Sequence, residues 1–391
     1  MTKCWDMASM ALLPLIGLAM YAVLISLLQE KLIYMPRSYD GTHREYYKKQ
    51  RQQASSTLIG LGGSKVINLK YTLNDGTPQI AYFLAPPALR RNQKIRRKKK
   101  NNPAHTAIDI DGDIDGDGDG DKVKAAEALP SSPPFQLWMA ASGNAGLALD
   151  WLDTSVHFIQ QNNRRTRTHG FLLVDYPGYG SNGGAPSPAT ILETSNLALA
   201  RLDRHLSKKY PRQTDYTVSY VAHSIGCSAV MQHAVSLVQK GIHGGMGGKS
   251  SKTVRVKNIV LVSPFTTMID MAGLALPLPI PGVQYLLRHG WDNLRSMKEL
   301  GELLLLDDGS DDAASLSEPM TLTIIHGDAD QIVPVDMGRK VHSIAKEMAA
   351  LVKKKHQGKK MLKVYYHEIR HGDHNRILGH AEDVIFKAMR R

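Results

Sequence analysis

Short apolar runs that alternate with helix-like stretches constrain the fold of this chain more than any other feature of its sequence. The runs occupy residues 135–140, 171–175, 216–222, 257–263, 320–326 and 362–367. Helix-like patterns, such as residues 189–209 and 225–240, lie between most of them. Strands that alternate with helices form a mainly parallel sheet with both faces covered. We therefore predict an α/β fold, and two further runs at residues 66–73 and 79–84 predict an added hairpin.

The length and composition suit one large domain with additional segments. The chain has 391 residues, of which 42% are hydrophobic, so it can bury a substantial core. We predict an anchor at residues 1–30, a linker at 31–64 and the α/β domain at 65–391. Within the domain, residues 90–134 are predicted to be an insertion. Residues 264–319, between the sixth and seventh strands, are predicted to be a small cap.

The N-terminal segment is predicted to be an uncleaved transmembrane helix. No charged residue occurs between Asp6 and Glu30, and a helix of that length spans the bilayer core of about 30 Å. The alternative is a cleaved signal peptide, but a cut after Ala19 would leave an apolar remainder. Basic residues are more frequent after the span than before it, which favours a cytosolic α/β domain and leaves the lumenal side open.

The insertion at residues 90–134 begins with a basic run and continues into Asp-Gly repeats. Such a low-complexity polyampholyte is predicted to be disordered. An EF-hand that starts at Asp111 or Asp113 would place Lys122 or Lys124 where the bidentate Glu is needed, so no EF-hand is expected, and weak calcium binding by the acidic run stays open. The formal net charge is +13, but short basic runs are typical of solvated loops. No nucleic-acid partner is expected.

The sequence Ala222-His223-Ser224-Ile225-Gly226 carries the main chemical signal. It follows an apolar strand and precedes a helix, which is the pattern of a sharp turn with a nucleophilic serine at its apex. Ala222 departs from the usual Gly-x-Ser-x-Gly, but the position requires only a small residue. The alternative is a serine in an ordinary turn between strand and helix.

Two further elements follow in the order Ser, Asp, His. Asp330 follows the strand at 320–326 and is preferred over Asp328 as the orienting acid. His374 follows the last strand and is preferred over His371 as the base. A serine hydroxyl needs an imidazole to take its proton, and the imidazole needs a carboxylate to fix its tautomer. Turns that follow parallel strands lie at one edge of the sheet, so the three side chains are expected to meet there.

An oxyanion hole needs two N–H donors. The first is expected to be the backbone N–H of Ile225, directly after the nucleophile. The second is expected from the loop at residues 141–146, where Asn144 is the preferred donor. The alternative is that this loop is a plain Gly-rich turn.

At this point the chain resembles a known family. Over residues 64–391 it looks like the α/β-hydrolase superfamily. More narrowly, it resembles the membrane-anchored branch that includes bud-emergence homologues and protein depalmitoylases. The matching pieces are Glu30-Lys31-Leu32-Ile33-Tyr34, Gly143-Asn144-Ala145-Gly146, Asp175-Tyr176-Pro177-Gly178-Tyr179-Gly180, the turn at Ser224, Ser263-Pro264-Phe265, His326-Gly327-Asp328-Ala329-Asp330 and Gly372-Asp373-His374-Asn375. The resemblance implies a catalytic triad of Ser224, Asp330 and His374. It also implies an oxyanion hole at Asn144 and Ile225. Ser142 departs from it, since members commonly carry His there, and so does the insertion at 90–134.

The resemblance implies a serine hydrolase that cleaves acyl esters or thioesters through an acyl-enzyme, with protein depalmitoylation as one form. Lysophospholipase or monoacylglycerol lipase activity is the alternative, a peptidase is a weaker one, and a non-catalytic binding protein of the same fold is a different class. The apolar, proline-interrupted segment at 264–319 would suit acyl chains, although it could equally pack on the core. The expected partners are a lipid or acylated-protein substrate and a membrane, and no cofactor is expected.

Overall fold

The fold is that of a computed structural model. It describes residues 20, 29–31, 33–87, 89, 135–163, 168–210, 216–244, 255–275, 287–306, 319–358 and 362–391.

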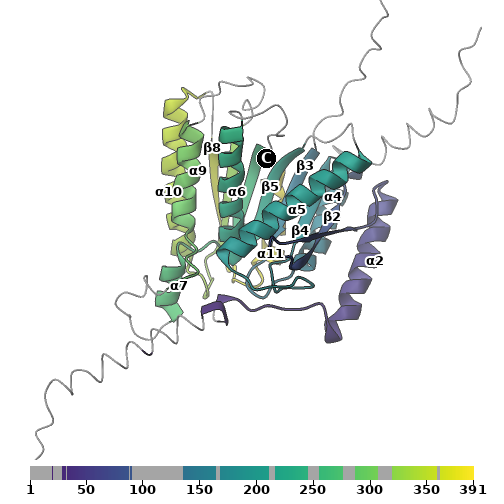
Figure 1. Ribbon diagram of the computed structural model, residues 1–391. Coiled ribbons are helices and arrows are strands. Elements are labelled where there is room, and N and C mark those ends of the chain that lie inside the picture. Colours follow the sequence, from purple (N-terminus) through teal and green to yellow (C-terminus); the bar gives the residue numbers. More distant parts are fainter. Residues whose placement is uncertain are drawn as a thin grey trace, which may run out of the picture.

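An eight-stranded sheet with the order β1-β2-β4-β3-β5-β6-β7-β8 forms the centre of the molecule (Figure 1). The strands are β1 (Ile67–Thr72), β2 (Pro78–Leu84), β3 (Phe135–Ala141), β4 (His169–Val174), β5 (Tyr216–His223), β6 (Arg255–Val262), β7 (Met320–Gly327) and β8 (Leu362–Ile369). β2 pairs antiparallel with both β1 and β4, while β4, β3, β5, β6, β7 and β8 run parallel. The predicted α/β fold with a mainly parallel sheet is confirmed.

Helices cover both faces of the sheet. They are η1 (Gly41–His43), α2 (Arg44–Gly60), η2 (Ala148–Trp151), α4 (Leu152–Asn163), α5 (Pro188–Lys209), α6 (Ile225–Gly244), α7 (Met268–Ala275), α9 (Asn293–Leu306), α10 (Val335–Lys355), α11 (Ile377–His380) and α12 (Glu382–Met389). Buried side chains of α5, α6, α9 and α10 pack on one face, and those of α2, α4 and α12 pack on the other.

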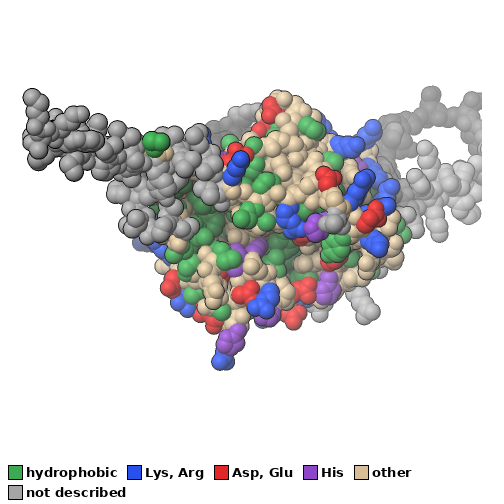
Figure 2. All heavy atoms as spheres, turned by 90° about the horizontal axis from the view of Figure 1, so that it is seen from below, with side chains coloured by type: hydrophobic (Ala, Val, Ile, Leu, Met, Phe, Trp, Pro, Cys, Tyr) green, Lys and Arg blue, Asp and Glu red, His purple; other side chains and the backbone are tan. Residues whose placement is uncertain are grey.

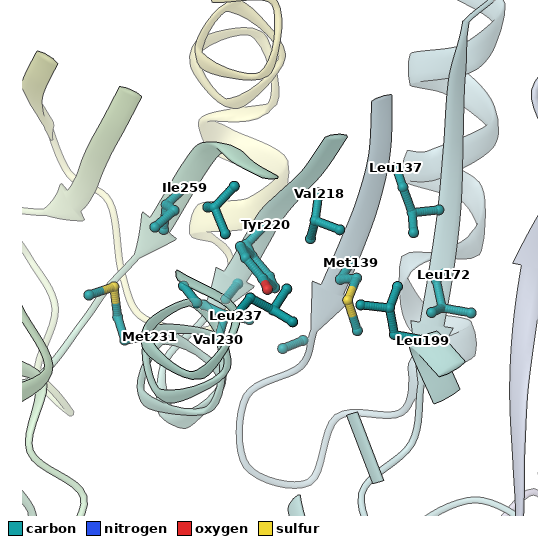
Figure 3. Packing of buried hydrophobic residues seen from close by; sticks show 14 of the residues in the cluster. Leu137, Met139, Leu172, Leu199, Val218, Tyr220, Val230, Met231, Leu237 and Ile259 are labelled. Atoms are coloured by element: carbon teal, nitrogen blue, oxygen red, sulfur yellow. The ribbon is translucent and has the colours of Figure 1, made fainter. Parts of the chain in front are cut away.

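The two cores follow from the alternation of side chains along each strand. In β3, Leu137 and Met139 point to the α6 side, whereas Trp138 and Ala140 point to the α4 side. Figure 3 shows the first of these cores, in which strand residues such as Val218 and Tyr220 face Leu237 of α6. Strands β3 to β7 are buried on both faces, so they read as nearly continuous apolar runs.

The segment expected to be a linker, residues 31–64, carries η1 and α2. The structure shows that this segment is partly helical and where its helix packs. α2 lies against α4, and Tyr34, Tyr47 and Leu58 are buried in the core on that face. This segment therefore takes part in the tertiary structure of the domain.

The transmembrane helix in the predicted fold class is corrected. A membrane-spanning helix needs about 20 predominantly apolar residues, and no helix among the described residues combines that length with that apolarity. Long helices such as α5 carry charged residues along their exposed face. Residues 1–19 and 21–28, on which most of the predicted anchor falls, lie outside the described part.

Two other predicted segments lie wholly or partly outside the described residues. Of the insertion at 90–134, no residue lies within the described part. Of the predicted cap at 264–319, the described portion contains α7 and α9. α9 packs against α6 and α10 and buries Met297 and Leu300 in the core, so it belongs to the helical layer of the sheet. Of the two helices described in this segment, α7 is the one that stands where a cap over the sheet edge was expected.

Candidate active site

The carboxyl ends of the parallel strands form one edge of the sheet, and the turns that carry the predicted site residues lie there. The elements that follow these ends, including α7 and α11, lie together at the lower side of Figure 1. Figure 2 views the molecule from that side and shows hydrophobic side chains around a hollow in which histidine side chains are visible. The candidate site is therefore at the edge that the topology favours for ligands.

The turn between β5 and α6 presents Ser224. Its backbone φ is 55°, a left-handed conformation that is unfavourable for a residue with a side chain. The turn is held in part by a hydrogen bond from the Ser224 N–H to the carbonyl of Val262, at 2.9 Å. A Cβ on Gly226 would lie 2.6 Å from the carbonyl oxygens of Ala141 and Ser142. Only a glycine therefore lets α6 approach β3 this closely.

Ser224, His374 and Asp330 form a continuous hydrogen-bonded series. The Oγ of Ser224 lies 3.0 Å from Nε2 of His374, and Nδ1 of His374 lies 2.7 Å from Oδ2 of Asp330. All three residues are buried. Loops that are far apart in the sequence thus converge at distances suitable for proton transfer.

The surroundings of Asp330 favour its carboxylate form. Burial opposes ionisation, but the hydrogen bonds from His374 and from the backbone N–H groups of Val333 and Ile332 outweigh it, so the pKa of Asp330 is lowered. These N–H groups lie 2.8 and 3.0 Å from Oδ1. Oδ1 is thus held by the backbone, which leaves Oδ2 for the imidazole of His374. A carboxylate fixed in this way sets the tautomer of the neighbouring imidazole.

The rival acid and base lie together outside this series. Oδ1 of Asp328 accepts a hydrogen bond from the backbone N–H of His371, at 2.6 Å. His371 is exposed and has a φ of 55°. Asp328 therefore joins the loop after β7 to the loop after β8.

Two further histidines line the site and were not singled out from the sequence. Nε2 of His223 lies 3.0 Å from the carbonyl oxygen of His374, and burial, followed by the proximity of His374, lowers the pKa of His223 to about 3. Nε2 of His326 lies 2.8 Å from the carbonyl oxygen of Val333 and 3.6 Å from Oδ2 of Asp330. Both therefore donate from Nε2 to backbone carbonyls as neutral imidazoles. The signal was their position inside the motifs around Ser224 and Asp330.

The expected oxyanion donors lie beside the serine. Ile225 begins α6, so its backbone N–H belongs to the first turn, where no intrahelical acceptor exists. The loop that carries Asn144 is close to the serine, because a Cβ on Gly143 would lie 3.2 Å from Cβ of Ser224. The carboxamide oxygen of Asn144 is already used, since it accepts from the backbone N–H of Met35 at 2.8 Å. The backbone N–H of Asn144 stays the expected second donor.

The motif at residues 175–180 supports this loop from the neighbouring strand end. The hydroxyl of Tyr176 donates to the carbonyl of Ser142 at 2.6 Å, and that of Tyr179 donates to Oδ1 of Asn144 at 3.2 Å. Oδ1 of Asp175 accepts from the backbone N–H of Ala148 at 2.7 Å. The sequence indicated this motif through the resemblance, but it did not indicate these contacts.

Among the residues that the structure describes, no group of three or more His, Cys, Asp or Glu side chains is arranged to hold a metal ion. The acidic repeats at residues 109–121 are outside that set. The described site itself offers a hydroxyl, an imidazole, a carboxylate and backbone N–H groups, which are the components of acyl-transfer chemistry.

The fold and this arrangement define the class of protein, and the comparison with known families agrees. The chain belongs to the α/β-hydrolase family, whose sequence pattern it matches over residues 140–387. The predicted resemblance to this superfamily is thereby confirmed, and membership supports a hydrolase. The narrower branch stays a prediction.

Individual relatives share a minority of their residues with this chain. The chain is 26% identical to the YfhR protein of Escherichia coli K12 over 212 residues, 54% of this chain and 58% of that protein. It is 30% identical to human ABHD12B over 179 residues, 45% of this chain and 41% of that protein. The chain spans about half the length of these curated relatives.

The chain is also similar to the solved structures of two enzymes, one archaeal and one bacterial. The Pyrococcus furiosus esterase PF2001 matches 92% of this chain and 98% of its own, with a TM-score of 0.47 and 11% identity. Est1E from Butyrivibrio proteoclasticus matches 83% of this chain and 95% of its own, with a TM-score of 0.42 and 15% identity. Likenesses of this size do not bear on the substrate.

Proposed function

We propose that this protein is a serine hydrolase that cleaves carboxylic esters or thioesters through an acyl-enzyme. The proposal rests above all on the hydrogen-bonded series from Ser224 through His374 to Asp330, with distances of 3.0 and 2.7 Å. The ionised Asp330 accepts from Nδ1–H of His374, which leaves Nε2 as the acceptor that faces the serine hydroxyl.

The reaction then follows from these positions. His374 takes the proton as Oγ of Ser224 attacks the carbonyl carbon, and the negative charge that develops on the carbonyl oxygen is met by the N–H groups of Ile225 and Asn144. When the tetrahedral intermediate collapses, His374 gives the proton to the leaving alcohol or thiol. Water then attacks the acyl carbon while His374 takes a proton from it. The second intermediate collapses to the free acid as His374 returns that proton to Oγ of Ser224.

Exposed apolar side chains around the candidate site favour a substrate that is recognised by its acyl group. Large hydrophobic side chains are exposed on segments at this edge of the sheet, namely Met35, Ile269 and Leu274 of α7, and Ile332 after β7. Exposed apolar groups around a site favour apolar ligands. A lipid or an acylated protein is therefore the proposed substrate class.

Protein depalmitoylation is the finer proposal, and hydrolysis of lysophospholipids or monoacylglycerols is its alternative. Contact with a membrane and a cytosolic location stay predictions.

Labelling with a fluorophosphonate tests the proposal directly, because this reagent reacts with an activated serine. Ser228, one helical turn after Ser224, provides a matched control, since it is buried and its Oγ has no hydrogen-bond partner. We expect labelling of the wild type and of Ser228→Ala, and none of Ser224→Ala. p-Nitrophenyl esters and acyl thioesters of graded chain length then define the substrate.

Two results count against the proposal. Equal labelling of Ser224→Ala would place the reactive group elsewhere. Absence of both labelling and hydrolysis in folded wild-type protein would favour a non-catalytic binding protein of the same fold.

A further inference from the structure

Residues 33–40 cross the carboxyl edge of the sheet, and we call them the N-terminal strap. In Figure 1 the strap is part of the purple trace that passes beneath the sheet towards α2. Its two ends are fixed by buried tyrosines. The hydroxyl of Tyr34 accepts from Nε1 of Trp291 at 3.0 Å, and the hydroxyl of Tyr39 donates to Oδ2 of Asp175 at 2.7 Å. The strap is therefore held at defined points on both sides of the site.

Between these ends the strap contacts the loop at residues 142–146. The backbone N–H of Met35 lies 2.8 Å from Oδ1 of Asn144 and 3.0 Å from the hydroxyl of Tyr179. The guanidinium of Arg37 donates to the carbonyl of Ala145 at 3.1 Å. The strap is itself fixed to the motif after β4, because the N–H of Gly180 donates to the carbonyl of Arg37 at 2.7 Å.

The loop needs such support, because its backbone is unfavourable without it. Ala145 has a φ of 61°, which costs a residue with a Cβ on the order of 1 kcal/mol. Its N–H donates to Oδ1 of its neighbour Asn144 at 3.0 Å, and its carbonyl accepts from Arg37. Both hydrogen bonds depend on atoms that the strap also contacts.

We propose that the N-terminal strap is a positioning element for the oxyanion loop, with Arg37 as its main side chain. By holding Asn144 and Ala145, the strap directs the backbone N–H of Asn144 towards the oxyanion. This inference rests on the proposed function for its kinetic consequence. Its structural consequence, an ordered loop at 142–146, holds independently.

Arg37 acts through the loop and does not touch the reacting atoms. Other groups around its guanidinium are Tyr47, whose hydroxyl lies 3.4 Å from one terminal nitrogen, and Asp150, whose carboxylate lies 3.8 Å from the other. Asp150 also accepts from the N–H of Leu147 at 2.8 Å. Arg37 thus links the strap, α2 and the C-terminal part of the loop.

The test compares Arg37→Ala and Arg37→Lys with the control Arg201→Ala. Arg201 matches Arg37 in its main contact, because it also donates to a backbone carbonyl, that of Lys70 at 3.0 Å, but it lies on α5 away from the loop. The first measurement is amide hydrogen exchange of residues 142–147. The second is kcat and KM for a short p-nitrophenyl ester.

We expect faster exchange of these amides in Arg37→Ala and wild-type exchange in Arg201→Ala. We also expect kcat of Arg37→Ala to fall about tenfold with little change in KM, because a displaced donor weakens only the transition state. Arg37→Lys, which keeps one donor, should recover part of both effects.

Unchanged exchange in Arg37→Ala would overturn the inference whatever the kinetics show. A fall in kcat of equal size in Arg201→Ala would overturn it as well, since the effect would then be general. If the wild type hydrolyses no ester, the proposed function fails, and the exchange measurement still decides whether the strap orders the loop.

Discussion

The imidazole of His223 lies against that of His374, with the ring centroids 4.7 Å apart, and its Nε2 donates to the backbone carbonyl of His374 at 3.0 Å. The residue before the candidate nucleophile thus holds the loop that carries the candidate base. These two contacts connect two of the three loops that must converge for the chemistry.

Replacing His223 should therefore impair the reaction without removing any reacting group. In His223→Ala the loop after β8 loses the hydrogen bond that ties its backbone to the serine turn. We expect kcat to fall roughly tenfold, since misplaced catalytic groups lose rate steeply. The cavity and the lost hydrogen bond should also lower the free energy of unfolding by about 1–3 kcal/mol. Steady-state kinetics and urea unfolding measure the two effects. His371→Asn, a change in the exposed histidine of the same loop, should alter kcat less than His223→Ala does.

The two aspartates after β7 should differ sharply when each is changed to asparagine. Asp330→Asn removes the carboxylate that fixes the tautomer of His374, and kcat should fall by roughly 10³–10⁴. Asp328→Asn keeps an oxygen to accept from the N–H of His371, so kcat should stay within about tenfold of the wild type, as expected for a group outside the proton-transfer series. Ester hydrolysis at saturating substrate makes the comparison. The assignment of the acid is wrong if the larger loss follows Asp328→Asn.

Gly226 should not tolerate a methyl group. A Cβ there would lie 2.6 Å from two backbone oxygens, which cannot move aside as a flexible side chain could. We expect Gly226→Ala to lower the free energy of unfolding by about 1–3 kcal/mol and to reduce fluorophosphonate labelling. Gly273 in α7 is the control, because a Cβ there meets no atom within 4 Å. Gly273→Ala should leave stability unchanged or raised by up to about 1 kcal/mol. Thermal unfolding of both variants decides.

Buried histidines should make the folded state sensitive to acid. Burial and, to a smaller extent, Lys240 lower the pKa of His233 to about 3, from an ordinary value of 6.5. Between these values the unfolded chain binds a proton that the folded state excludes. The contribution of His233 to stability is therefore fully present above about pH 6.5 and is lost as the pH falls towards about 3. This loss is on the order of 1 kcal/mol per pH unit.

The variant His233→Gln tests this linkage. Nδ1 of His233 lies 3.0 Å from the hydroxyl of Tyr220, and the glutamine amide can replace that contact without titrating. Urea unfolding between pH 4 and 7 should give a shallower pH dependence for His233→Gln than for the wild type. Equal slopes would show that His233 does not couple to folding in this range.

The strand pattern and the order of the motifs were sufficient to predict the sheet and three of the site residues. Periodicity identified all eight strands, because buried strands leave runs of apolar residues. The positions of Ser224, Asp330 and His374 just after strands predicted that they lie at one edge. What periodicity could not supply was the role of α9, which the sequence placed in a cap. Its apolar pattern is the same whether its partner is an acyl chain or α6 and α10.

The sequence by itself determined the local structure and the chemical identity of the candidate site, because both depend on residue types and on the spacing of neighbours along the chain. The tertiary structure alone decided which groups contact one another across long separations. Met35 reaches Asn144 and His223 reaches His374 through hydrogen bonds between residues 109 and 151 positions apart. Such pairs leave no periodic signal, since their distance is set by the packing of whole elements and not by any local preference of the backbone.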